Sequence, residues 1–134
     1  MLTATFVVQV EAPSSAACLS SGLLTVPVVS GLASALTMLR TRGVRIAGAL
    51  IGTGHSAAFF ANALQSDRLC AVAGARVIAM DPAAIARVTG VDAERMIEHD
   101  PLMGQPVRHF AALGGVDVVL EDSSPARILA FATR

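Results

Sequence analysis

The chain has 134 residues, which is enough for about one domain with a hydrophobic core. Ten arginines balance ten acidic residues, lysine is absent, and the formal net charge is zero. With no net positive charge, nothing drives the chain electrostatically onto nucleic acid, so no nucleic-acid partner is expected.

One uncharged segment raises the question of a membrane span. Residues 12–39 carry no charge and are followed by Arg40, Arg42 and Arg45, which is the length and basic flank of a spanning helix. Serines, threonines, Pro27 and a glycine interrupt it, and no basic residue precedes it as a secretory signal requires. We therefore expect a cytoplasmic chain in which this segment is a helix buried on most sides inside an assembly. The alternative is a small membrane protein with a span near 21–39.

Apolar spacing and turn residues divide the chain into alternating strands and helices. In chain order the expected elements are strand 3–10, helix 26–39, strand 44–51, helix 56–65, strands 67–72 and 75–80, helices 82–89, 93–99 and 106–113, strand 116–120 and helix 123–134. The run 44–51 is short, apolar and rich in branched residues, as a strand buried on both faces would be. The alternation predicts an α/β fold with largely parallel, short strands.

Three of these helices begin after residues that favour N-caps. Asp81 precedes one helix, Asp92 precedes the next, and Ser123 or Ser124 precedes the last, with Pro125 near its first position. Ser56 or a neighbour is expected to cap the helix 56–65 in the same way.

The stretch IGTGHSAAFF, residues 51–60, has the features of a strand that leaves into a glycine turn and then a helix. Gly52 and Gly54 allow a tight turn, and the small residues Ser56–Ala58 let another group approach the first helical turn closely. A helix start presents N–H groups without intrahelical partners, which suit a phosphate, a carboxylate or a developing enolate.

Three nucleotide and hydrolase signatures fail at this turn. No Gly-Lys-Ser/Thr follows, the dinucleotide pattern lacks its third glycine, and the serine-hydrolase elbow has Ala58 where glycine is needed. What remains is a set of donors without a nucleophile, the minimum for an oxyanion hole. The candidate catalytic residues, as an oxyanion cradle with His55 as proton donor, are Gly54, His55, Ser56 and Ala57.

Residues around this cradle are the candidates for substrate binding: Gly52, Thr53, Ala58 and Arg87. The Arg87 guanidinium could hold a carboxylate with a forked pair of donors, or it could bond neighbouring carbonyls in a structural role. His55 could equally be a surface histidine of the loop. The three histidines lack metal-ligand spacing, so no metal site is expected.

The run GALIGTGHSAAFFANALQSDRLCAVAGARVIAMDPAAIARVTGV, residues 48–91, resembles the carboxyltransferase-like branch of the crotonase superfamily. Within that branch it is most similar to the gamma subunit of biotin-independent malonate decarboxylase. The positions that match the family pattern are Gly52, Ser56, Phe59, Arg68, Met80, Ala86, Arg87, Val88 and Thr89. The tail 93–122 also resembles the end of that family, and the resemblance runs from about residue 5 to 122.

This resemblance implies a crotonase-like ββα spiral formed by residues 1–134 as a single reduced domain, without the N-terminal elements of longer relatives. It also implies a lyase component of a hetero-oligomer, with a larger carboxyltransferase-like beta subunit and an acyl carrier protein as partners. The substrate would be a malonyl thioester carried on the acyl carrier protein's prosthetic group, with no cofactor bound directly by this chain. Decarboxylation would leave acetyl thioester.

One departure from the family pattern leaves a second function class open. Ala57 and Ala58 replace paired glycines at the helix start, which keeps the amide donors and narrows the room for a thioester. The alternative is therefore a non-catalytic crotonase-like partner that completes a hetero-oligomer while another subunit holds the reactive site.

Overall fold

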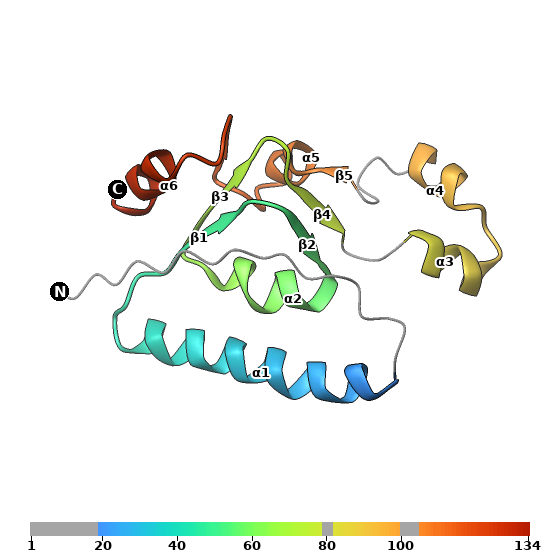
Figure 1. Cartoon of the computed structure of the whole chain (residues 1–134), viewed down its shortest axis with the longest axis horizontal. Helices are drawn as coiled ribbons and strands as arrows, with labels where there is room; N and C mark the ends of the chain where they lie inside the picture. The colour runs from blue at the N-terminus through green and yellow to red at the C-terminus, as the bar shows by residue number, and fades with distance from the viewer. Residues whose placement is uncertain (1–18, 79–81, 100–104) are drawn as a thin grey trace.

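The structure, a computed structural model, describes residues 19–78, 82–99 and 105–134. Figure 1 shows short strands between helices on both sides. The elements in chain order are α1 (Leu19–Thr41), β1 (Ala47–Leu50), β2 (Thr53–His55), α2 (Ser56–Ala61), the 3₁₀ turn η1 (Ala63–Gln65), β3 (Arg68–Val72), β4 (Arg76–Ile78), α3 (Pro82–Thr89), α4 (Ala93–His99), β5 (Gln105–Pro106), α5 (Val107–Ala112), β6 (Val118–Leu120) and α6 (Pro125–Ala132).

The strands form two small sheets between which the chain passes repeatedly. One sheet has the order β1-β3-β6 and is wholly parallel, while the other has the order β2-β4-β5, with β2 and β4 parallel and β5 antiparallel to β4. The pairs β1-β2 and β3-β4 each take one strand from each sheet before the chain enters a helix. This repeated strand, strand and helix order confirms the expected α/β fold with short, largely parallel strands.

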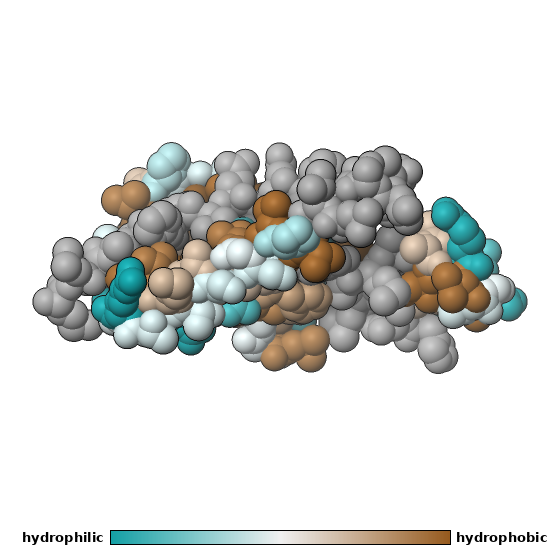
Figure 2. Space-filling model, turned by 90° about the horizontal axis from the view of Figure 1, so that it is seen from below, coloured by the Kyte–Doolittle hydropathy of each residue, from teal (hydrophilic) through white to brown (hydrophobic). Residues whose placement is uncertain are grey.

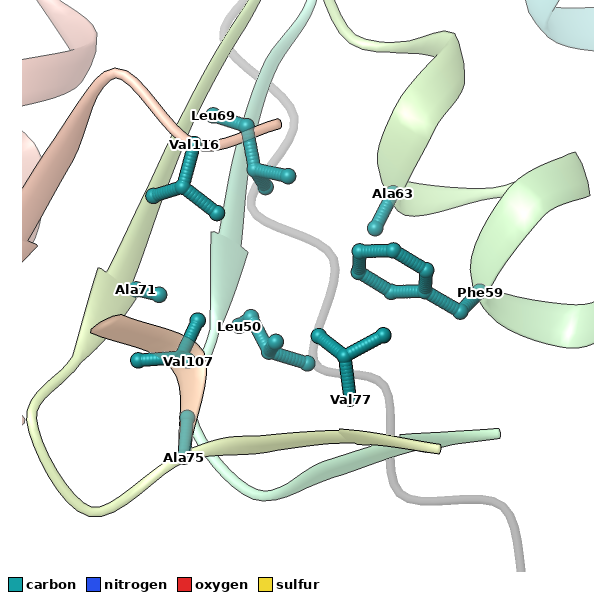
Figure 3. Close-up of a cluster of buried hydrophobic side chains, with 9 residues drawn as sticks. All are labelled: Leu50, Phe59, Ala63, Leu69, Ala71, Ala75, Val77, Val107 and Val116. Carbon is teal, nitrogen blue, oxygen red and sulfur yellow. The ribbon is translucent and has the colours of Figure 1, made fainter. Parts of the chain in front are cut away.

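The strand β1 is buried on both faces, as the apolar run 44–51 predicted, and the middle of β3 beside it is buried too, whereas β6 is largely exposed. Leu50 of β1 and Leu69 of β3 lie in a cluster with Phe59, Val77 and other side chains (Figure 3). The intervening residues Ala49 and Cys70 face the opposite cluster, with Ile128 and Phe131 of α6. Successive strand residues point to opposite faces, so the strands contribute to two cores at once.

The helix α1 lies outside this core. It packs against α2 and η1 beneath the strands, and it ends where Gly43 adopts a φ of 78°. The amides of Gly43 and Val44 donate to the carbonyls of Arg40 and Leu39 at 2.9 and 3.1 Å, which closes the helix.

Several boundaries differ from the sequence expectation, and the expected helix 56–65 is divided into α2, which ends at Ala61, and the 3₁₀ turn η1. The first helix begins at Leu19 and contains Pro27 in its interior, because proline removes one helical hydrogen bond but does not always end a helix. Residues 53–55, expected as turn, pair with 76–78 as β2. The two-residue strand β5, which was not expected, closes on β4.

The capping residues also differ in part. The Asp92 Oδ1 atom accepts the amides of Glu94 and Arg95 at 2.8 and 3.3 Å, which confirms its predicted cap. His55 rather than Ser56 stands at the N-cap of α2, and Ser124 stands at that of α6 without a side-chain bond. The expected strand 3–10 and the Asp81 cap lie outside the described residues.

In the part of the chain that the structure describes, no helix is long and apolar enough to cross a membrane.

Candidate functional site

The strand-to-helix junction predicted from the sequence lies at the end of β2. Gly52 follows β1, and its carbonyl accepts the amide of Arg76 at 3.1 Å, which joins the two strand pairs at this point. Thr53, Gly54 and His55 then pair with β4, and Ser56 begins α2 without an intervening loop. The paired strand holds the start of α2 in a fixed position.

Gly54 is buried, and glycine is required at this position because Phe59 packs against it, not because the backbone turns here. A Cβ atom at Gly54 would lie 2.6 Å from Cδ2 of Phe59 and 3.0 Å from Cγ. The Phe59 ring folds back from α2 onto β2, is fully buried, and meets the Phe110 ring edge to face at 5.4 Å. Gly54 therefore lets the first turns of α2 pack directly on the strand. Positive φ values belong to Gly43, Gly90 and Gly114 among the described residues, so Gly54 needs no left-handed backbone.

The amides of the first helical turn are the candidate oxyanion donors, and that role stays a prediction. The backbones of Ser56, Ala57 and Ala58 form this turn, and no acceptor outside the helix is recorded for their amides within the described residues. The side chains of these three residues lie outside what the structure describes. His55 is half buried in an extended conformation, its side chain makes no capping hydrogen bond to α2, and its role as proton donor stays a prediction.

Arg87 is not joined to this junction in the described structure. It lies exposed on α3, which packs chiefly against α4. No hydrogen bond or ion pair among the described residues links it to residues 52–58. Thr53 is half buried on β2, and its role as a substrate contact stays a prediction.

Three hollows of the described surface lie away from the junction, at the end of the sheet where β1 and β3 begin. One is lined by the α1 to β1 turn, the start of β3 and the end of the chain, one by β6 and α6 beside Arg68, and one by the end of α1 with the following turn; none is lined by residues 52–58. Arg68 lies between two of them, with its guanidinium 4.4 Å from the centre of the Phe131 ring and an Nη1 that donates to the Phe131 carbonyl at 3.2 Å. None of these three hollows coincides with the candidate cradle.

Two aspartates support the strands in a way that the sequence reading missed. Asp67 Oδ2 accepts the Ile46 amide at 2.8 Å while its Oδ1 pairs with Arg40 at 3.1 Å. Asp117 Oδ2 accepts the Leu69 amide at 2.7 Å. Each carboxylate stands one residue before a strand, and that position was the only signal available from the sequence. In the described residues, no group of three or more histidine, cysteine or acidic side chains gathers around a common point.

The fold defines an α/β protein of short, largely parallel strands arranged in two small sheets. In the comparisons with solved structures, the chain is similar to a Pseudomonas malonate decarboxylase hetero-tetramer in complex with coenzyme A, with a TM-score of 0.77 and 29% identity over 95% of this chain. It is similar to the Pseudomonas malonate decarboxylase MdcD-MdcE hetero-dimer with a TM-score of 0.74 and 30% identity, again over 95% of this chain. No curated protein sequence is significantly similar to it.

The family model for the malonate decarboxylase gamma subunit matches residues 3–132. The chain belongs to the malonate decarboxylase gamma subunit family, which confirms the resemblance seen in its sequence. It covers 52% and 53% of the two solved chains, and so spans about half the length of these relatives.

Proposed function

We propose that this chain is a gamma-type subunit that helps a larger carboxyltransferase-like beta subunit to decarboxylate a malonyl thioester on an acyl carrier protein. The observation that carries the proposal is the family match over residues 3–132. It is supported by the similarity of the fold to structures of malonate decarboxylase hetero-oligomers.

In the proposed reaction the junction stabilises one negative charge, that of the enolate oxygen. The bond between the carboxylate carbon and Cα of the malonyl group breaks, carbon dioxide leaves, and the electron pair moves onto the thioester oxygen as an enolate. The amides of Ser56, Ala57 and Ala58 would donate to that oxygen, and each well-placed donor contributes about 3 to 4 kcal/mol to such a transition state. His55 would then deliver a proton to Cα, which gives the acetyl thioester.

The packing of Phe59 against Gly54 supports this assignment because it fixes the start of α2. Donors stabilise a developing charge best when they are held in place before the reaction, since no reorganisation is then required. In the proposed complex the larger subunit would supply further walls of the site. Gly52, Thr53 and Ala58 would line the entry, and Arg87 would hold a carboxylate only if the assembly brings α3 closer.

A non-catalytic partner subunit is the second candidate, and one observation favours it. The first turn of α2 carries Ala57 and Ala58 where the family pattern has paired glycines, so two methyl groups narrow the room for a thioester. In that case the larger subunit would hold the whole reactive site and this chain would complete the oligomer.

Replacing Ala57 within the intact complex separates the two candidates. The complex of this chain, the larger subunit and the carrier protein is assembled with Ala57→Leu, and the decarboxylation rate of malonyl carrier protein is measured. The exposed Ala112 of α5 gives the matched control, Ala112→Leu. The catalytic proposal expects a loss of about 10²-fold or more for Ala57→Leu and none for the control. An unchanged rate in a stable Ala57→Leu complex would remove the cradle from the mechanism and favour the partner role.

A further inference from the structure

The exposed side of α1 is apolar along most of its described length. Among residues 26–41, Leu36 alone is buried, while Val28 is 70% exposed and Met38 is 53% exposed. Residues 19–39 contain no charged side chain. Figure 2 looks onto this side of the molecule and shows brown apolar and pale small side chains exposed along it. Such a surface gains free energy when another apolar surface covers it.

Arginines border this apolar side at the end of the helix. Arg40 pairs with Asp67, but Arg42 and Arg45 of the following turn have no carboxylate partner among the described residues. One of the three hollows runs from Thr37 of α1 to Arg45 and so joins the helix to the turn. An apolar centre with arginine at its edge is the usual anatomy of a protein interface.

We propose that Val28, Leu32 and Met38 of α1, together with Arg42 and Arg45, form one interface, here named the α1 surface, for a different protein chain. That chain would present an apolar face bordered by carboxylates. We identify that partner chain as the larger decarboxylase subunit, and only this identification rests on the proposed function.

The distribution of charge argues against a second copy of the same chain. A symmetric antiparallel pairing would place Arg42 and Arg45 beside the early part of the partner's α1, where residues 12–39 offer no carboxylate. A parallel pairing would bring the arginines of the two copies together, which is repulsive. Both arrangements bury the apolar side chains but leave the arginines without partners. A different chain with acidic residues at the matching edge satisfies both parts of the α1 surface.

The test measures the affinity of the full chain for the purified larger subunit by isothermal titration calorimetry at low and moderate salt. The variants Val28→Glu and Met38→Glu place a charge on the apolar part, and Arg42→Glu with Arg45→Glu reverses the basic part. Met38→Gln provides a milder change if a glutamate lowers the helix content seen by circular dichroism. The matched controls are Leu113→Glu, at a position 65% exposed, and Arg108→Glu on the exposed side of α5.

We expect Val28→Glu and Met38→Glu to weaken binding about tenfold or more, and the arginine reversal to weaken it most at low salt. The controls should bind as the unchanged chain does. Unaltered affinity in all the α1 variants would overturn the α1 surface while leaving the proposed function intact. Failure of the unchanged chain to bind the larger subunit at all would instead contradict the proposed function.

Two other occupants of the α1 surface give distinct results. Sedimentation of the chain alone would show a dimer that Met38→Glu dissociates, if a second copy were the occupant. If a bilayer were the occupant, the chain would float with vesicles of phosphatidylcholine and phosphatidylglycerol, and the Met38→Glu variant would not. Either result would overturn the proposal.

Discussion

Replacing Gly54 tests whether the start of α2 is held by direct packing on β2. In Gly54→Ala the new methyl group would lie 2.6 Å from Cδ2, 3.0 Å from Cγ and 3.2 Å from Cβ of Phe59. Ordinary contacts between carbon atoms fall at about 3.5 to 4.0 Å, so the ring must move by several tenths of an ångström or more. Phe59 is fully buried and rests on Phe110, which leaves it little room. Overpacking of this kind costs about 1 to 3 kcal/mol.

This cost is measured by urea unfolding followed by circular dichroism. Gly74→Ala is the control, because a Cβ there meets nothing within 4 Å and Gly74 is not among the glycines with positive φ. The cost should shrink in a Phe59→Ala background, where the ring is absent, which a double-mutant cycle shows directly. An equal loss in both backgrounds, or no loss in the single variant, would refute the packing argument.

Three further predictions follow from the supports of the sheet and the helix. Asp67→Ala should lower the free energy of unfolding by about 1 to 3 kcal/mol, because the buried Ile46 amide loses its acceptor. Arg40→Ala should lower it by about 1 kcal/mol or less, because the ion pair is partly exposed. Chemical denaturation compares the two variants, and equal losses would contradict the assignment. Gly31→Ala should stabilise the chain by about 0.5 to 1 kcal/mol, since the new methyl group meets nothing within 4 Å in a helix interior, and a lower thermal midpoint would speak against it. Burial raises the pKa of the Cys70 thiol, so its contribution to folding is present below the ordinary thiol pKa and is lost as the pH rises toward the raised value. Unfolding free energies from neutral to alkaline pH should therefore fall more steeply for the unchanged chain than for Cys70→Ala, and parallel curves would contradict this.

Much of the fold follows from local patterns in the sequence. The run 44–51 contains a strand buried on both faces, and Asp92 caps its helix as its side chain predicted. Pro125 opens the last helix, where its missing amide costs nothing. These elements depend on apolar spacing and on residues adjacent to the helix starts, both of which are visible in the chain itself.

The junction shows where local patterns fail. The sequence predicts a turn at Gly54 because glycine permits one, whereas its structural role is to make room for Phe59, five residues later on α2. Residues 53–55 form a strand because β4 pairs with them, and a three-residue strand has no signal that a single sequence can show. The strand β5 depends on the same kind of nonlocal pairing.

The helix α1 marks another limit of the sequence reading. Its uncharged, apolar composition indicated a helix buried on most sides inside an assembly, but within the described chain it contacts mainly α2 and η1. Composition thus indicated that the apolar side of α1 is buried against another surface, but it could not show which surface that is. The arginines at its end, which first suggested a membrane flank, are equally suited to an acidic partner.

The most direct test of the proposed function is the initial rate at which malonyl carrier protein releases carbon dioxide in the presence of the larger subunit, with and without this chain. The gamma-subunit assignment predicts rapid release when both subunits are present and a loss of about 10²-fold or more when this chain is omitted. A rate that is the same with and without this chain would contradict it.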